Sequence, residues 1–248
     1  MIKGFSTGAI AKADFRKALQ MLQDSDTNAV ELSALRESEI ISLVASLDLL
    51  QLTKYNYISI HAPSRLVNMR ENQLVDLLHQ VIAKGFPVIV HPDIIVDFNI
   101  WASLGSFLCI ENMDKRKKSG RSFVDLTHIF NRLPDASFCF DIAHAAQVDP
   151  SMTEAYLMLS KLSNRLKEVH ISSVNSQSIH EPITLDSLMA FSKVAHLIPK
   201  DVPIIFESPV SESQIDLEMQ KLSYLFDNNL LNKINPIIIE HSYRHLSH

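Results

Sequence analysis

Residues 107–144 read FLCIENMDKRKKSGRSFVDLTHIFNRLPDASFCFDIAH and contain two short apolar runs separated by one longer segment. Short apolar runs occupy Phe107–Glu111 and Ser137–Asp141, and the segment between them, Phe123–Arg132, repeats apolar residues at helical spacing. A strand followed by a helix and a second strand is typical of a parallel sheet. Both runs end on an acidic residue, so this stretch also places a carboxylate at the C-terminal end of each predicted strand.

The same alternation continues on both sides of this stretch. Eight apolar runs alternate with helical segments, and eight such units in 248 residues predict a single-domain (β/α)8 TIM barrel over residues 1–248. An open doubly wound sheet is disfavoured because the chain has five glycines and lacks GxGxxG, a Walker loop and a GxSxG elbow. The predicted strands are Lys3–Ser6, Ala29–Leu32, Tyr57–His61, Pro87–Val90, Phe107–Glu111, Ser137–Asp141, Leu166–Ile171 and Pro203–Glu207. The predicted helices are Phe15–Leu22, Glu39–Leu50, Asn72–Ala83, Phe123–Arg132, Thr153–Leu162, Leu185–Leu197 and Ser213–Phe226, with a short one at Val96–Leu104.

The composition describes a soluble globular chain. Hydrophobic residues make up 46% and charged residues 21%, and the formal net charge is −5, so a bulk polycation is excluded and an anionic ligand must be met locally. Two cysteines, Cys109 and Cys139, exclude a disulfide framework and a Cys-rich zinc module, and they favour a reducing cytoplasm. The N-terminal residues do not resemble a signal peptide, and no apolar run approaches the length of a membrane span.

Ionisable side chains close six successive predicted strands. Catalytic groups of such barrels come from the C-terminal strand ends. One histidine there is usually structural, but a whole set facing one cavity would be repelled or desolvated without cations, which predicts a metal site. The candidate ligands are His61, His91, Glu111, Asp141, His144, His170, His180 and Glu207. Histidines interpreted instead as packing or surface residues are His79, His128 and His196 in predicted helices, and His241, His245 and His248 in the tail Pro236–His248.

The motifs around these ligands resemble those of the xylose isomerase-like barrel superfamily, which includes endonuclease IV, UV damage endonuclease, and single-metal sugar isomerases and epimerases. In the endonuclease IV pattern, HAP, HP, EN and DxxH follow the third to sixth strands, a histidine lies on the seventh, DxH follows it, and a glutamate closes the eighth. Two positions depart: Ser178 replaces the Asp of DxH, and Ser172 and Ser173 replace the Asn-Asp after the seventh-strand histidine. The resemblance therefore implies that a third metal ion is held weakly or is absent. The matching motifs are His61-Ala62-Pro63, His91-Pro92, Glu111-Asn112, Asp141 to His144, His170, His180 and Glu207.

The resemblance implies two enzyme classes. An isomerase or epimerase of a sugar or sugar phosphate would hold one ion through Glu111, Asp141, His170 and Glu207, and the two glutamates would move the proton. A phosphoesterase of the endonuclease IV (AP endonuclease-like) type needs two or more ions, and His61, His91 and His180 exceed what one ion requires. We therefore favour the phosphoesterase, with Glu111 and Glu207 as catalytic residues and Zn²⁺, Mn²⁺ or Fe²⁺ as the ions. An inactive metal-binding barrel is the remaining alternative, and its sequence support is Ser178.

A basic loop follows the fifth predicted strand. Met113–Arg121 lies on the catalytic side of a barrel, where it is expected to contact phosphate, either of abasic-site DNA or of a sugar phosphate. A solvated charged surface is the alternative. Arg36 and Arg65 also follow strand ends and are as well explained by surface ion pairs. The proposed substrate-binding residues are Lys115, Arg116, Lys117, Lys118 and Arg121.

Overall fold

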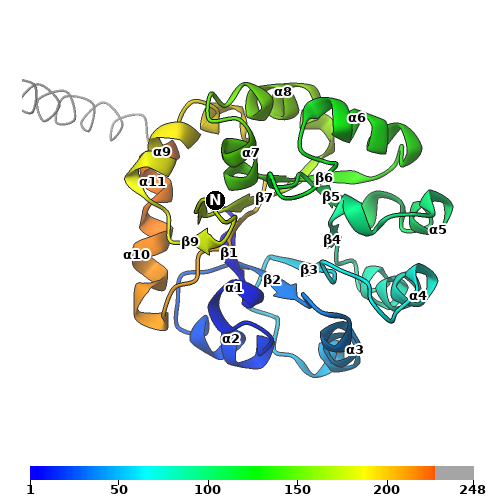
Figure 1. The fold of residues 1–248 in the computed structure, drawn as a ribbon. Helices are drawn as coiled ribbons and strands as arrows, with labels where there is room; N and C mark the ends of the chain where they lie inside the picture. The colour runs from blue at the N-terminus through cyan, green and yellow to red at the C-terminus, as the bar shows by residue number, and fades with distance from the viewer. Residues whose placement is uncertain (227–248) are drawn as a thin grey trace, which may run out of the picture.

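A computed structural model describes residues 1–226, so the tail histidines lie outside the described residues. Eight parallel strands close into a barrel in the order β1-β10-β7-β6-β5-β4-β3-β2, and helices surround it (Figure 1). The predicted (β/α)8 fold is therefore confirmed. The barrel strands are β1 Lys3–Ser6, β2 Ala29–Ser33, β3 Tyr57–His61, β4 Val88–Val90, β5 Leu108–Glu111, β6 Ser137–Asp141, β7 Leu166–Ile171 and β10 Ile204–Phe206.

The predicted strands match the observed ones to within one residue at each end. Strand β1 pairs with β2 on one side and with β10 on the other, which closes the sheet without a free edge. The register aligns Asp141 of β6 with His170 of β7 and Ser33 of β2 with His61 of β3. The polar strand ends therefore lie at the same level of the barrel.

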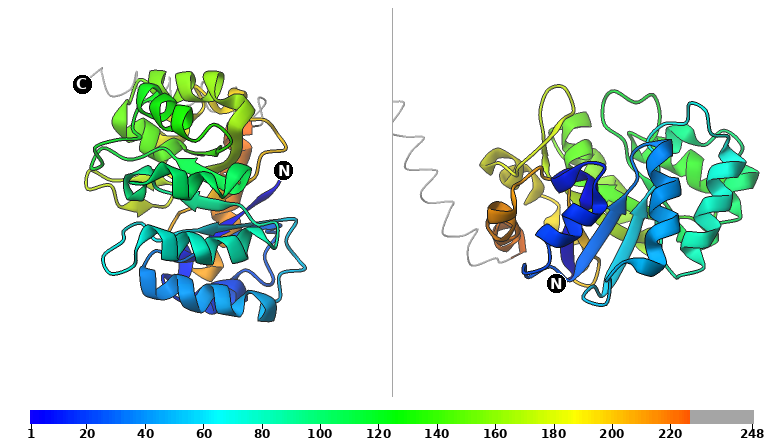
Figure 2. Two further views of the ribbon diagram at one scale, coloured as in Figure 1. Left: turned by 90° about the vertical axis from the view of Figure 1, so that its right-hand side faces the viewer. Right: turned by 90° about the horizontal axis from the view of Figure 1, so that it is seen from below.

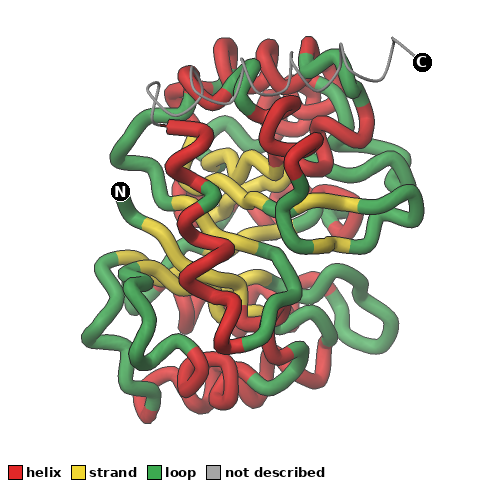
Figure 3. Tube along the Cα trace, turned by 90° about the vertical axis from the view of Figure 1, so that its left-hand side faces the viewer, coloured by secondary structure: helices red, strands yellow, loops and turns green. Residues whose placement is uncertain are grey.

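Helices cover the outside of the barrel in each of the three views of the ribbon (Figures 1 and 2). Several predicted helices are shorter than expected: Glu39–Leu50 and Leu185–Leu197 each finish in a separate 3-10 turn, and Ser213–Phe226 is divided in two. Figure 3 shows these last two helices crossing one side of the strands. The helices are α1 Thr7–Ala11, α2 Phe15–Met21, α3 Glu37–Ser46, α4 Glu71–Ile82, α5 Phe98–Ala102, α6 Phe123–Arg132, α7 Ile142–Val148, α8 Thr153–Lys161, α9 Leu185–Phe191, α10 Ile215–Gln220 and α11 Leu222–Phe226.

Two apolar clusters support the barrel. The large one, which includes Trp101, Phe138 and Phe140, packs the sheet against its helices. The small one joins Ile89, Cys109 and Cys139 on three neighbouring strands, and both cysteines are buried free thiols. Side chains alternate across a strand, so this small cluster faces the barrel interior, two residues below the polar strand ends.

The sequence pattern missed three local elements. Helices α1 and α7 begin directly after β1 and β6, and a hairpin of β8 (Ser173–Val174) and β9 (His180–Glu181) follows β7. The hairpin returns His180 toward the barrel mouth. Among residues 1–226, no helix has both the length and the apolar character needed to cross a membrane.

Candidate metal centre

The structure brings all eight candidate ligands together at one mouth of the barrel. They form three adjacent groups, and within each group one donor atom per residue lies within 4.8 Å of the others. Two carboxylates are shared between groups: Glu111 belongs to the first and second, and Asp141 to the second and third. The groups are His61, His91 and Glu111; Glu111, Asp141, His170 and Glu207; and Asp141, His144 and His180.

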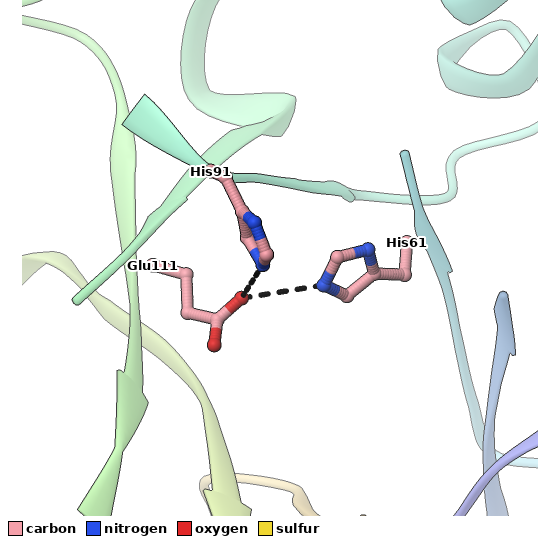
Figure 4. A group of neighbouring side chains, drawn as sticks. All are labelled: His61, His91 and Glu111. Carbon is pink, nitrogen blue, oxygen red and sulfur yellow. Dashed lines mark hydrogen bonds and ion pairs between the residues drawn. The ribbon is translucent and has the colours of Figure 1, made fainter. Parts of the chain in front are cut away.

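Glu111 at the end of β5 connects the first group to the second. Its Oε2 lies 3.3 Å from His61 Nε2 and 3.1 Å from His91 Nε2 (Figure 4). Its other oxygen, Oε1, lies 3.2 Å from His144 Nδ1 and 3.8 Å from His170 Nδ1. The two oxygens thus face different histidines, which is the arrangement of a bridging carboxylate.

Asp141 caps a helix with one oxygen and presents the other to the candidate centre. Its Oδ1 accepts a hydrogen bond from the His144 backbone N–H at 2.7 Å and so caps α7. Its Oδ2 is buried without a hydrogen-bond partner and lies 3.3 Å from His144 Nδ1. The helix cap orients the carboxylate, and the second oxygen remains free for an ion.

The residues present fit divalent metal ions. Three buried donor atoms at the centre have no hydrogen-bond partner, namely Asp141 Oδ2, His170 Nδ1 and Glu207 Oε2. A buried polar atom without a partner is costly, and an ion at this position would satisfy all three. The donors are imidazole nitrogens and carboxylate oxygens, which suit zinc, manganese or iron.

Without bound ions, protonated histidines balance the buried carboxylates. Burial alone lowers the pKa of His61, but Glu31 and Glu111 outweigh it and raise the pKa to about 9. Burial likewise opposes the protonation of His144, whose pKa rises to about 10 because of Asp141 and Glu111. In the ion-free protein, protons on His61 and His144 therefore supply the positive charge that bound metal ions would otherwise supply.

The pKa of Glu207 is also raised, whereas those of His91 and His180 are lowered. Burial and the neighbouring carboxylates Glu111 and Asp141 raise the pKa of Glu207 to about 8, although His170 opposes the rise. Burial lowers the pKa of His91 and of His180. Glu207 is thus a carboxyl group that can hold a proton near neutral pH.

Ser178 does not face the candidate ligands. Its backbone is left-handed, with φ 57°, and its hydroxyl donates to Gln147 Oε1 at 2.7 Å. Gln147 Oε1 also accepts from the Lys115 backbone N–H at 3.3 Å, so this contact links the β8–β9 turn to the basic loop. Ser178 therefore adds no donor to the third group, in which Asp141 is the carboxylate.

A cavity of about 1150 Å³ opens over the centre. Of the five basic residues predicted to bind substrate, Arg116 and Lys117 line it, whereas Lys115, Lys118 and Arg121 do not. Arg116 and Lys117 are each held by an acidic residue, through contacts of 2.7 Å to Asp114 Oδ2 and 2.6 Å to Asp93 Oδ2.

Three further cations line the cavity: Lys12, Arg65 and Arg70. None of them has an ion-pair partner among residues 1–226. Lys12 also has a left-handed backbone, with φ 56°, where glycine would avoid strain.

Sequence reasoning missed two buried glutamates beneath the centre. Glu31 on β2 and Glu168 on β7 are fully buried, and both contact His170. The available signal was a charged residue inside an apolar strand, in AVELS and LKEVHI. By contrast, the helical histidines His79, His128 and His196 are exposed, as expected.

Solved structures of three proteins share this architecture. Endonuclease IV from Thermus thermophilus is 19% identical, with a TM-score of 0.59 over 91% of this chain and 99% of that one. A candidate sugar phosphate isomerase/epimerase from Anabaena variabilis ATCC 29413 is 16% identical, with a TM-score of 0.58 over 84% of each chain. SacUVDE is 15% identical, with a TM-score of 0.55 over 95% of this chain and 99% of that one. This chain and the three solved structures therefore share the (β/α)8 barrel fold.

These similarities establish the fold and leave the reaction open. No protein-family profile matches the sequence, and no curated protein matches it.

Proposed function

We propose that the chain is a divalent-metal-dependent phosphoesterase of the endonuclease IV type. The observation that carries this proposal is the arrangement of eight donor side chains as three groups joined by Glu111 and Asp141. A single ion needs the four-residue group alone, so the other four donors, His61, His91, His144 and His180, would then have no metal to bind. Ions at neighbouring sites, when bound, activate the attacking water and neutralise charge on the phosphate.

The residues of the chain divide this work. The shared carboxylates Glu111 and Asp141 would each contribute to two neighbouring ion sites, and Glu207, which lines the cavity, would transfer a proton during turnover. The neighbour of highest TM-score reported above is an endonuclease IV, which is consistent with this reaction.

The second candidate is isomerisation or epimerisation of a sugar or sugar phosphate. Its support is the four-residue group of Glu111, Asp141, His170 and Glu207, which is complete for one ion, and a neighbour described as a sugar phosphate isomerase/epimerase. The replacement at Ser178 also favours fewer ions. An inactive metal-binding barrel is the third candidate, and an absence of turnover with full metal content would support it.

The metal content separates the first two candidates. Protein purified without chelator and saturated with Zn²⁺ or Mn²⁺ should contain two or more ions per chain by elemental analysis, because the donor groups are adjacent and share ligands. A firm ratio of one would contradict the multinuclear proposal and favour the isomerase. Turnover should then be compared on duplex DNA with an abasic site and on ketose phosphates.

We also propose that cavity cations bind the substrate phosphates. For a duplex substrate, the double change Arg65→Gln with Arg70→Gln should reduce the slope of log K against log salt by about 0.9 for each phosphate that is no longer neutralised. The matched control is Lys115→Gln with Lys118→Gln, which removes the same charge outside the cavity lining. An equal effect of both pairs would show a general charge effect and contradict a phosphate site in the cavity. A small sugar phosphate should give a much shallower salt dependence.

A further inference from the structure

The histidines of the centre differ in the kind of oxygen atom that contacts one of their two ring nitrogens. For some it is a neutral carbonyl or hydroxyl oxygen, and for His170 it is a carboxylate oxygen. Two of the histidines have a neutral oxygen at hydrogen-bond distance from Nδ1. A hydrogen bond to that oxygen fixes the tautomer and leaves Nε2 for an ion. The pairs are His61 with the Ala62 carbonyl at 2.8 Å and His180 with the Ser172 hydroxyl at 2.7 Å. His144 Nδ1 lies 3.0 Å from the Asn112 carbonyl but also 3.2 Å from Glu111 Oε1, so its contacts are mixed.

His170 is held by carboxylates through its other nitrogen. Its Nε2 lies 2.8 Å from Glu168 Oε1 and 3.1 Å from Glu31 Oε2. Its Nδ1 lies 3.8 Å from Glu111 Oε1 and 3.6 Å from Glu207 Oε2. The ring therefore stands between two carboxylates of the candidate metal centre and two that lie below it.

The lower carboxylates are fixed in place. Tyr57 on β3 donates its hydroxyl hydrogen to Glu168 Oε2 at 2.6 Å, across the barrel interior. Ser33 donates to Glu31 Oε1 at 3.2 Å. Glu31 and Glu168 are fully buried, so bulk water does not weaken their contacts with His170.

A hydrogen bond explains the Glu168 contact better than a second ion between Glu168, His170 and the nearby Cys139. Two ligands of one tetrahedral zinc ion, each about 2.1 Å from the metal, lie about 3.4 Å apart. The observed separation of 2.8 Å between Nε2 and Oε1 is shorter than that and fits an N–H donor to a carboxylate. His170 Nε2 therefore carries a proton, and Nδ1 is the nitrogen available to a metal.

We infer that Glu168 and Glu31 are positioning residues that turn His170 toward the four-residue group and make that group the first to bind an ion. A carboxylate that accepts the Nε2 proton makes the opposite nitrogen a stronger donor. The groups that contain the other histidines have one carboxylate each, whereas this group contains three. The inference rests on the metal centre of the proposed function and holds for either reaction.

Metal affinity measures this role without an activity assay. Metal-free protein is titrated with Zn²⁺ against a competing chelator, and Glu168→Gln should weaken binding of the first ion about 10- to 100-fold. The matched control is Ser172→Ala, which removes the neutral acceptor behind His180 and should leave the affinity for the first ion unchanged. A purely structural role of Glu168 would lower the melting temperature in chelator without this selective loss, and that result would overturn the inference.

Nitrogen NMR of the protein with one Zn²⁺ per chain gives a direct signature. His170 should show a protonated Nε2 and a metal-bound Nδ1, and the other histidines should not show a zinc-bound nitrogen. Coordination of the first ion by His61 or His180 would overturn the inferred order of binding.

A second variant guards against misfolding of Glu168→Gln. Tyr57→Phe keeps both glutamates and removes one hydrogen bond, so the affinity for the first ion should fall about fivefold. Unchanged affinity in both folded variants would overturn the positioning role while leaving the metal centre intact. Failure of the unmodified protein to bind any divalent ion would instead overturn the metal centre itself, and the inference with it.

Discussion

The Glu111→Gln variant should have a kcat lower by about 10³-fold or more and should bind fewer ions. Both oxygens of Glu111 face histidine nitrogens, Oε2 toward His61 and His91 and Oε1 toward His144. A glutamine keeps the shape but presents an amide NH₂ at one of these positions, so it cannot bridge two ions. The measurements are kcat on a phosphorylated substrate that the unmodified protein turns over, and metal content after saturation with Zn²⁺.

Glu218→Gln is the matched control for Glu111→Gln. Glu218 is also a buried carboxylate, but it accepts hydrogen bonds from Ser208 and the Ile183 backbone and pairs with Lys221, outside the three donor groups. This variant should be less stable while keeping its ions and most of its turnover. If Glu111→Gln retained full metal content, the bridging arrangement would be wrong.

His91→Ala then distinguishes one ion from several. His91 belongs to the first group alone, so its loss should remove an ion and most turnover in a multinuclear enzyme. In an isomerase that uses the four-residue group, the central ion and turnover should both persist.

The barrel and the candidate ligands at its strand ends could be predicted because both follow from short-range patterns. Apolar runs that alternate with helical segments define the strands, and a parallel barrel brings every C-terminal strand end to one mouth. His61, Glu111 and Asp141 each close a strand, so their meeting needed no knowledge of side-chain packing.

The glutamates beneath the centre could not be predicted in the same way. Glu31 and Glu168 lie inside strands rather than at their ends, and their role depends on His170, which lies far from Glu31 in the sequence. The Tyr57 hydroxyl that fixes Glu168 is 111 residues away in sequence. Contacts of this range are set by strand order and register, which local periodicity does not contain.

The basic loop shows a different limit of prediction from sequence. Its sequence indicates how much charge it carries, but the charge available to a ligand depends on neighbouring acidic residues. Asp114 and Asp93 hold Arg116 and Lys117, while Lys115, Lys118 and Arg121 lie outside the cavity lining. The other cations of the cavity come instead from loops whose isolated charges gave no strong signal in the sequence.

The metal-free protein should lose stability as the pH rises from about 7 to about 9. His61 and His144 have pKa values of about 9 and about 10 in the folded chain, against 6.5 for an unperturbed histidine. Over this range the folded state binds more protons than the unfolded state, so the free energy of unfolding falls with pH. Glu207 has the same sign, because its pKa is raised from 4.5 to about 8.

Bound divalent ions should remove this trend. They replace the protons on the imidazoles, and at a free concentration 100 times Kd one ion adds about 2.7 kcal/mol to the free energy of unfolding. Urea unfolding at both pH values, with chelator or with Mn²⁺, measures the effect. The double variant His61→Gln with His144→Gln should flatten the pH dependence in chelator, whereas His128→Gln, which removes an exposed helical histidine, should not. Constant or rising stability of the chelated protein between these pH values would show that the buried carboxylates are not balanced by protonated histidines, and the electrostatic argument for cations at this mouth would fail with it.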